Sequence, residues 1–224
     1  MKKNKHFSKR NSAFSLVELL VVMAIITVMA GVGMAVFRGG TASSGGREAS
    51  TIAYSLFNAA RTEAILRQSP ARVIVDTVYN SGRPENYLRR ISIAALRSRE
   101  DTTNPAVVLD ADGNTDPAIA SNWSQIQKWV FLSQGVYYDA DYSKPTGTMD
   151  ITFAGSGAPT SGYDYYEFSA NGRASDLQFV VSPGLLVGTQ FKVKNEGQLR
   201  YGFVVHLLGR MSFFPDVASI PPVL

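Results

Sequence analysis

The stretch "FSLVELLVVMAIITVMAGVGMAVF", Phe14–Phe37, decides how the chain is organised, because it is strongly apolar and holds one charged residue, Glu18. As a helix, these 24 residues would rise about 36 Å at roughly 1.5 Å per residue, more than the ~30 Å hydrocarbon core of a bilayer. The sequence therefore predicts a transmembrane helix. A charged residue in such a span costs about 2.5 to 3.5 kcal/mol near its centre and usually has a functional partner.

Positive charge is concentrated before this stretch. Five basic residues and no acidic residue occupy positions 1–13, and without them the chain of net charge +4 would carry −1. Lys and Arg beside a span hold that end in the cytoplasm. We therefore expect a single-pass protein of the bacterial inner membrane with its N-terminus cytoplasmic and the remainder periplasmic or extracytoplasmic. The absence of cysteine excludes a disulfide framework and leaves the redox compartment open.

Two ordinary explanations of the N-terminus account for it less well. A secretory signal peptide has an apolar region of about 7 to 15 residues that is free of charge, whereas this run is longer and contains Glu18. A plain signal anchor explains the length and the positive flank but leaves Glu18 without a role.

The order of residues 13–22, "AFSLVELLVV", resembles the prepilin signal of type IV pilins and type II secretion pseudopilins. The resemblance implies that prepilin peptidase cuts between Ala13 and Phe14 and N-methylates Phe14. Glu18 would then be an assembly residue that pairs with the amine of a neighbouring pilin or pseudopilin subunit. The family prefers glycine before the cut, where this chain has alanine, which is also small.

Simple electrostatics gives Glu18 the same role. Cleavage before Phe14 would create a charged α-amino group at a helix N-terminus, which already carries the positive pole of the helix dipole. Glu18 lies four residues further, on the same face of the helix, where its carboxylate can offset both charges.

Beyond the span, residues 38–46 read "RGGTASSGG", and this Gly/Ser-rich composition predicts a hinge that breaks the helix. Helical spacing returns over residues 47–69, ending before Pro70. The apolar stripe of this second helix is formed by Ile52, Ala53, Leu56, Phe57, Ala60 and Ala64.

Residues 70–224 predict a β-rich domain, since short alternating runs are separated by turn residues. The expected strands are 72–76, 88–96, 128–133, 149–153, 163–169, 177–182, 187–193, 200–207 and 211–214, and Asn171-Gly172 is the best hairpin signal. The segment "AARTEAILRQSPARVIVD", Ala59–Asp76, is similar to the end of the first helix and the first strand in GspH/FimT-type minor pseudopilins. The final "YGFVVHLLGRMSFF" resembles the closing hairpin of that group.

Residues 98–121 predict a long exposed loop that contains a weak calcium candidate. Asp110, Asp112, Asn114 and Asp116 alternate as in calcium-binding loops, and oxygen ligands suit a hard cation. However, Thr115 stands where such loops need glycine, and Ser121 where they need glutamate. A solvated turn explains the spacing better, so we predict no metal and no other cofactor.

Catalytic motifs are lacking. One histidine, His206, remains outside the leader, and neither a metal cluster nor a Ser-His-Asp set can be built around it without further ligands. Nucleic acid is an improbable partner, because the mature chain would be near neutral and phosphate binding needs clustered positive charge.

The sequence thus predicts an α+β, pilin-like protein that is not an enzyme. Its parts are a leader (1–13), a transmembrane and assembly helix (14–37), a hinge (38–46) and a globular domain (47–224). The expected function is that of a minor pseudopilin in a type II secretion-like filament. Alternatives are a minor type IV pilin for pilus assembly or DNA uptake, and a signal-anchored extracytoplasmic binding domain or enzyme. A looser likeness is to pilin-like cassette proteins of Verrucomicrobia.

Overall fold

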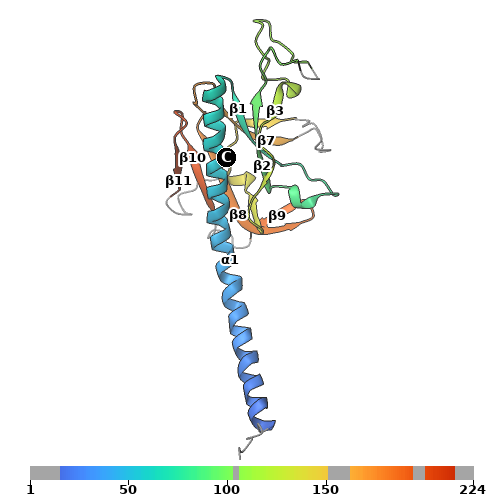
Figure 1. The fold of residues 1–224 in the computed structure, drawn as a ribbon, viewed down its shortest axis with the longest axis vertical. Coiled ribbons are helices and arrows are strands. Elements are labelled where there is room, and N and C mark those ends of the chain that lie inside the picture. Colours follow the sequence, from blue (N-terminus) through green and yellow to red (C-terminus); the bar gives the residue numbers. More distant parts are fainter. Residues whose placement is uncertain (1–15, 103–105, 151–161, 194–199, 215–224) are drawn as a thin grey trace, which may run out of the picture. The chain divides into compact units, whose positions relative to one another are not determined.

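The computed structural model describes residues 16–102, 106–150, 162–193 and 200–214, with the side chains of 16–19 and 24–44 outside the description. The chain divides into two compact units, Met1–Thr41 and Ala42–Leu224. One helix, α1 (Leu16–Arg67), contributes to both units, and all the strands belong to the second (Figure 1).

Helix α1 runs through residues 38–46, so the predicted hinge is wrong for the backbone of this segment. Glycine lowers helix stability by roughly 1 kcal/mol relative to alanine but does not break a helix as proline does, and Leu16–Arg67 contains no proline. At Gly46 the missing side chain has a packing role. A Cβ atom there would lie 2.2 Å from the Tyr201 ring, so only glycine allows this approach.

The end of α1 agrees with the prediction to within two residues. Gln68 adopts a left-handed conformation with φ 50°, and the Ser69 amide donates back to the Ala64 carbonyl at 3.2 Å. This is the Schellman arrangement that satisfies the last carbonyls of a helix. Pro70 follows, which prevents the helix from continuing.

The strands form two antiparallel sheets. The first has the order β3-β2-β1-β7-β6, with β4 also on β2, and the second has the order β11-β10-β8-β5, with β9 on β8. The bounds in the first sheet are β1 Ala71–Val75, β2 Arg90–Leu96, β3 Trp123–Gln125, β4 Val130–Phe131, β6 Gly147–Met149 and β7 Tyr163–Phe168. In the second sheet they are β5 Val136–Tyr138, β8 Leu177–Val187, β9 Gln190–Val193, β10 Tyr201–Val205 and β11 Met211–Phe213. In the described connections lie the short 3-10 helices Pro84–Asn86, Ala120–Asn122 and Ala140–Tyr142.

Most predicted strands are confirmed, with three differences. Of the predicted strand 149–153, residues 151–153 lie outside the described residues, and β6 ends at Met149. First, β8 continues through Pro183 and Gly184, where a break between two strands was expected, and it turns only after Val187. Pro183 pairs with Val136 at the end of the short β5 ladder, where a missing amide costs least. Second, β3 and β5 were not predicted, since three residues give too short a pattern. Third, Asn171-Gly172 forms a turn, but the strands that flank it, β7 and β8, enter different sheets.

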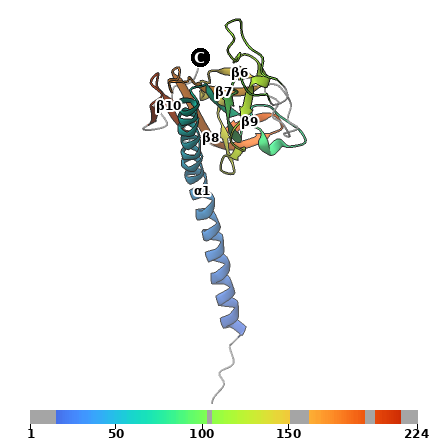
Figure 2. The same cartoon turned by 45° about the horizontal axis from the view of Figure 1, so that its top comes forward.

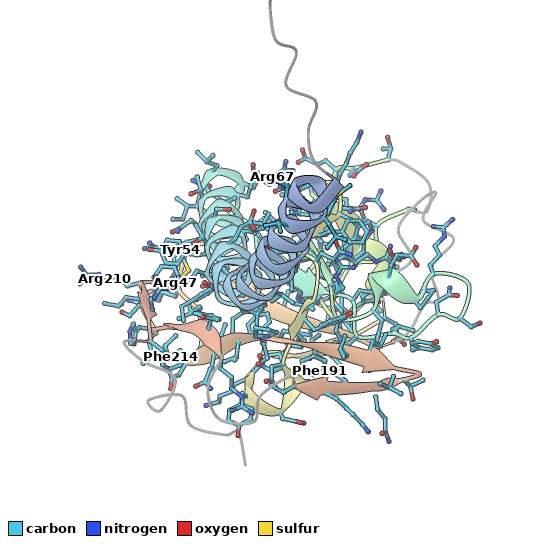
Figure 3. All side chains as sticks on the ribbon, turned by 90° about the horizontal axis from the view of Figure 1, so that it is seen from below. Arg47, Tyr54, Arg67, Phe191, Arg210 and Phe214 are labelled. Carbon is cyan, nitrogen blue, oxygen red and sulfur yellow. The ribbon has the colours of Figure 1, made fainter. Side chains whose placement is uncertain are left out.

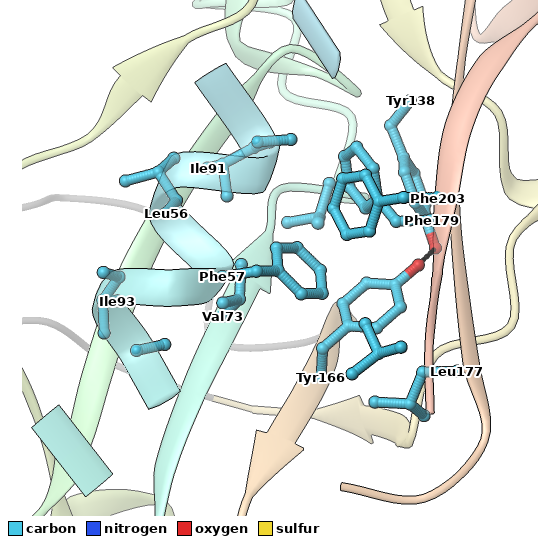
Figure 4. Close-up of a cluster of buried hydrophobic side chains, with 14 of the residues drawn as sticks. Leu56, Phe57, Val73, Ile91, Ile93, Tyr138, Tyr166, Leu177, Phe179 and Phe203 are labelled. Carbon is cyan, nitrogen blue, oxygen red and sulfur yellow. Dashed lines mark hydrogen bonds between the residues drawn. The ribbon is translucent and has the colours of Figure 1, made fainter. Parts of the chain in front are cut away.

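The core lies between α1 and both sheets (Figures 1 and 2). Five residues of the predicted stripe, Ala53, Leu56, Phe57, Ala60 and Ala64, are buried, while Ile52 is partly buried. The Phe57 ring lies 4.9 Å from both Tyr166 and Phe203 and 5.3 Å from Phe179, measured between centroids. Figure 4 shows Phe57 pointing from the helix into this aromatic group. The alanines let the helix approach closely, and Phe57 fills the space between the two sheets.

The other face of the first sheet carries a smaller apolar cluster, formed by Ile74, Ala94, Leu96, Trp123 and Tyr163. The guanidinium of Arg72 lies between two rings, 3.8 Å from the centroid of Trp123 and 4.0 Å from that of Tyr165, and it also pairs with Glu167 at 2.7 Å. Such cation–π contacts are favourable when the cation is partly desolvated. Side chains of the sheet itself therefore cover this face.

Candidate functional site: the assembly segment and the distal turns

The predicted processing site lies outside the described residues. Ala13 and Phe14 fall in the segment 1–15, and of Glu18 the structure describes only the backbone, which is helical. Their roles in cleavage, N-methylation and assembly therefore stay predictions.

The helix beside Glu18 exposes apolar side chains on consecutive positions. Leu20, Val21, Val22 and Met23 are each about half exposed or more. Four successive residues of a helix point in directions that cover its whole circumference. A helix that is apolar all round needs lipid or other protein to cover it, so this segment suits assembly. Among the residues that the structure describes, no helix meets the length and apolarity of a membrane span.

The acidic loop forms a tight turn. The Asp110 carboxylate accepts the amides of Asp112 and Asn114 at 3.0 and 2.8 Å, and the Asp116 carboxylate accepts that of Ala118 at 2.8 Å. Within the described part of the chain, no three His, Cys, Asp or Glu side chains are placed to share a metal ion. The alternating acids are explained as turn formers, which cap backbone amides.

A buried polar network sits within the core. Tyr138 Oη donates to Asp164 Oδ2 at 2.9 Å and lies 2.9 Å from Tyr166 Oη, which also reaches the Gln178 carbonyl at 3.2 Å. Figure 4 shows the bond between the two tyrosines. Burial raises the pKa of Asp164 above its ordinary value, although the hydrogen bond from Tyr138 opposes this shift. Burial likewise raises the pKa of Tyr138, so its hydroxyl keeps its proton and remains a donor.

Two turns of the same geometry meet at the C-terminal end of α1. In the first, the Ser169 amide donates to the Arg173 carbonyl at 2.8 Å and the Gly172 amide to the Ser169 carbonyl at 2.7 Å. In the second turn, between β10 and β11, the His206 amide donates to the Arg210 carbonyl at 2.8 Å and the Gly209 amide to the His206 carbonyl at 2.7 Å. Gly172 and Gly209 have φ values of 73° and 72°. Both are three-residue loops that close with a left-handed glycine.

Arg61 of α1 ties these turns together. Its Nε donates to the Gly172 carbonyl and its Nη2 to the Leu208 carbonyl, both at 3.2 Å. The turns also touch each other, since a Cβ atom on Gly209 would lie 2.1 Å from the Gly172 oxygen. The two turns are therefore joined by the Arg61 side chain and by the close approach of Gly209 to Gly172.

The residues that the two turns present differ. The first offers Ala170 and Asn171, which suit a turn, whereas the second offers Leu207 and Leu208, exposed to 66% and 62%. Beside the second turn lies an open hollow of about 680 Å³, lined by Leu207, Leu208, Asp176, His206, Arg210, Met211 and Ser212. His206 stands at this sheet edge, its Nε2 3.1 Å from Ser212 Oγ. Sequence reasoning missed this surface, although two leucines before a turn glycine were a readable signal.

Comparison with protein families gives one match: residues 8–34 match the family model described as the prokaryotic N-terminal methylation motif. This match covers the stretch that resembles a prepilin signal and confirms that resemblance. Comparison with curated protein sequences found no significant match.

Among solved structures, the chain is similar to a minor pseudopilin and to a type IV minor pilin. The minor pseudopilin EpsH from the type 2 secretion system of Vibrio cholerae shares 13% identity at a TM-score of 0.39, over 75% of this chain and 95% of EpsH. The type IV minor pilin FimU of Pseudomonas aeruginosa shares 14% identity at a TM-score of 0.38, over 79% of this chain and 92% of FimU.

Proposed function

We propose that this chain is a pilin-like subunit, specifically a minor pseudopilin of a type II secretion-like filament, whose work is assembly and not catalysis. The observation that carries the proposal is the N-terminal methylation motif over residues 8–34, with Glu18 inside it. The helical backbone at Glu18 and the exposed apolar side chains from Leu20 to Met23 support it.

In this proposal, prepilin peptidase removes residues 1–13 on the cytoplasmic side and methylates Phe14. The apolar helix holds the subunit in the inner membrane, with the β domain outside, until the subunit enters the filament. The Glu18 carboxylate then pairs with the Phe14 amine of a neighbouring subunit. In an apolar filament core this pair removes two uncompensated charges at once, which favours one axial register over the others.

Mass spectrometry of the full-length protein, isolated from bacterial membranes that contain a prepilin peptidase, tests the proposal. The expected N-terminus is N-methylated Phe14. An intact Met1 under these conditions would overturn the proposal and favour a signal-anchored domain. The matched control is Phe14→Pro, because proline removes the amide N–H and fixes the backbone at the bond to be cut, so this chain should keep its uncut N-terminus.

A further inference from the structure

The second sheet ends at β11, which has β10 as its one neighbouring strand among the described residues (Figure 1). The chain leaves β11 at Phe214, and ten further residues, 215–224, follow in the sequence. We propose that this C-terminal segment turns back along β11, so that residues 218–220 bind the free edge of the strand in antiparallel register. The inference concerns the globular unit alone and goes beyond the proposed filament role.

The backbone groups of Met211 and Phe213 point to this free edge. The amides of Phe214 and His206, at the two ends of the β10–β11 ladder, both donate across it, at 3.1 and 2.8 Å. Hydrogen-bonded and non-hydrogen-bonded pairs alternate in an antiparallel ladder. Ser212, midway between these two bonds, therefore also bonds to β10, whereas Met211 and Phe213 face outward. Within the described part of the chain, the amides and carbonyls of these two residues have no partner, so another strand can bind them.

The side chains at this edge are apolar and partly exposed. The Phe213 ring stacks on Tyr54 of α1 at 4.7 Å between centroids, yet 47% of Phe213 stays exposed. The residues of β10 opposite Phe213 and Met211 belong to the buried core, so both side chains lie on the face of the sheet that packs on the helix. In Figure 3, Tyr54 appears on the same side of the globular unit as Arg210 and Phe214, which flank β11. A further strand would extend the sheet beside the helix and cover Phe213.

The C-terminal sequence "PDVASIPPVL" suits this position. A four-residue hairpin loop can be built around a type I turn with Pro215-Asp216 at its centre, because proline is favoured there. This loop places Ala218 opposite Phe213. Two residues further, Ile220 lies opposite Met211. These two residues must donate amides to β11, and all three prolines of the segment fall in the turn or beyond the paired residues, where no amide is needed.

The side chains agree with the same register. Ala218 is small, and it comes beside Phe213, whose ring already fills the space next to the helix. Ile220 is apolar and comes beside Met211. On the other face of the sheet, Ser219 lies opposite the exposed Ser212, and hydroxyl side chains on facing strands form favourable pairs. The segment therefore turns apolar side chains to the helix and a polar one to water.

The residues after Ile220 would reach the exposed turn between β10 and β11. A segment antiparallel to β11 continues past Met211 toward the hollow lined by Leu207 and Leu208. Residues 221–224 extend about 12 Å at roughly 3.1 Å per residue, and they include Val223-Leu224, which would remove the two leucines from water. Because the segment belongs to the same chain, its effective concentration is high and a small contact suffices.

Amide hydrogen exchange of the full-length chain in detergent, followed residue by residue by NMR, tests the docking. In the native chain, the Met211 and Phe213 amides should be protected. In a chain that stops after Phe214, both should exchange at least tenfold faster, while the Ser212 amide, which bonds to β10, should change little.

Two proline substitutions provide a matched pair that leaves the segment in place. Ala218→Pro removes an amide that bonds the Phe213 carbonyl, so it should speed exchange at Phe213 as truncation does. Ser219→Pro removes an amide that points away from β11, a position where an edge strand tolerates proline, so exchange at Phe213 should match that of the native chain.

A cross-link tests the register. The chain has no native cysteine. Ser212→Cys with Ser219→Cys places two thiols at a non-hydrogen-bonded pair, where facing Cβ atoms are closest. Oxidation should therefore give a disulfide within the monomer. Ser212→Cys with Ala218→Cys is the matched control, because the second thiol then lies on the other face, and its yield should be several-fold lower.

Three results would overturn the inference. Equal exchange at Met211 and Phe213 in the native and truncated chains would mean that the edge of β11 is open. Equal disulfide yields from the two cysteine pairs would mean that the segment has no fixed register. Disulfide-linked dimers in place of the cross-linked monomer would mean that the edge takes its strand from a second copy.

Discussion

At the scale of single residues, Glu18 and Asp164 show that a carboxyl group can have two different roles in this protein. Glu18 is a carboxylate in an apolar helix whose partner, in our proposal, comes from another subunit. Asp164 is a half-buried carboxylate whose partner, Tyr138, belongs to the same core. For each of them, replacement by an uncharged residue gives a testable prediction.

Replacing Glu18 with alanine should strongly reduce incorporation into filaments while leaving cleavage before Phe14 intact. Removing one member of a buried ion pair costs about 3 to 5 kcal/mol, which corresponds to more than a hundredfold in affinity. Immunoblots that compare the amount of the protein in sheared filaments with the amount in total membranes measure its incorporation. Thr27→Ala, a change in the same helix without charge, is the control. Equal incorporation of Glu18→Ala and the native chain would contradict the assembly role.

Replacing Asp164 with asparagine should flatten the pH dependence of stability on the acidic side. Because the pKa of Asp164 is raised in the folded state, the folded protein binds its proton more tightly than the unfolded chain. This contribution to stability is complete below the ordinary carboxyl pKa of about 3.9 and is lost as pH rises through the raised folded value.

Urea unfolding of both chains in detergent over this range gives the comparison. The free energy of unfolding of the native chain minus that of the variant should fall as pH rises. A difference that stays constant with pH would show that Asp164 does not titrate between the two states. Asp112→Asn, in the exposed acidic turn, serves as the control.

At the scale of elements, α1 shows why a glycine-rich stretch does not have to be a hinge. Glycine weakens a helix by its backbone entropy, but here a neighbour occupies the space that a side chain would need. Gly45 and Gly46 are adjacent in sequence and differ in this respect. A Cβ atom on Gly45 would meet Val136 at an ordinary 3.4 Å, whereas one on Gly46 would overlap the Tyr201 ring at 2.2 Å.

The two glycines therefore predict opposite effects of the same substitution. Gly45→Ala should stabilise the protein by up to about 1 kcal/mol through helix propensity. Gly46→Ala should destabilise it by about 1 to 3 kcal/mol, since Tyr201 must move. Thermal unfolding followed by circular dichroism distinguishes them. Equal stabilisation by both changes would mean that Tyr201 yields without cost and that the packing explanation of Gly46 is incorrect.

At the scale of the whole globular unit, Arg61 links the helix to both sheets. The turn after β7 leads from the first sheet to the second, and the turn after β10 closes the second sheet. Arg61 bonds a carbonyl in each. The relative position of the two turns, and therefore the exposure of Leu207 and Leu208, depends on the Arg61 side chain.

Arg61→Ala should loosen both turns together. Hydrogen bonds from a charged donor contribute about 1.5 to 3 kcal/mol, less where water competes. We expect faster amide hydrogen exchange at Gly172 and Gly209, with little change at buried β1. Arg67→Ala is the matched control, because Arg67 makes an exposed i,i+4 pair with Glu63, a type worth about 0.3 to 0.5 kcal/mol. Exchange that rises at only one turn would refute the linked arrangement.

The sequence alone determined the features that depend on local pattern. The apolar run with Glu18, the buried stripe from Ala53 to Ala64, the helix end before Pro70 and most strands follow from spacing and turn residues. Tertiary structure decided what depends on contacts between distant segments. Gly46, which composition assigned to a hinge, is explained by its close packing against the Tyr201 ring. The strands on either side of Asn171-Gly172 belong to different sheets. Arg61 binds the backbone of the turn at which Leu207 and Leu208 are exposed. No local pattern records these outcomes, because each is set by contacts between separate segments that only the folded chain brings together.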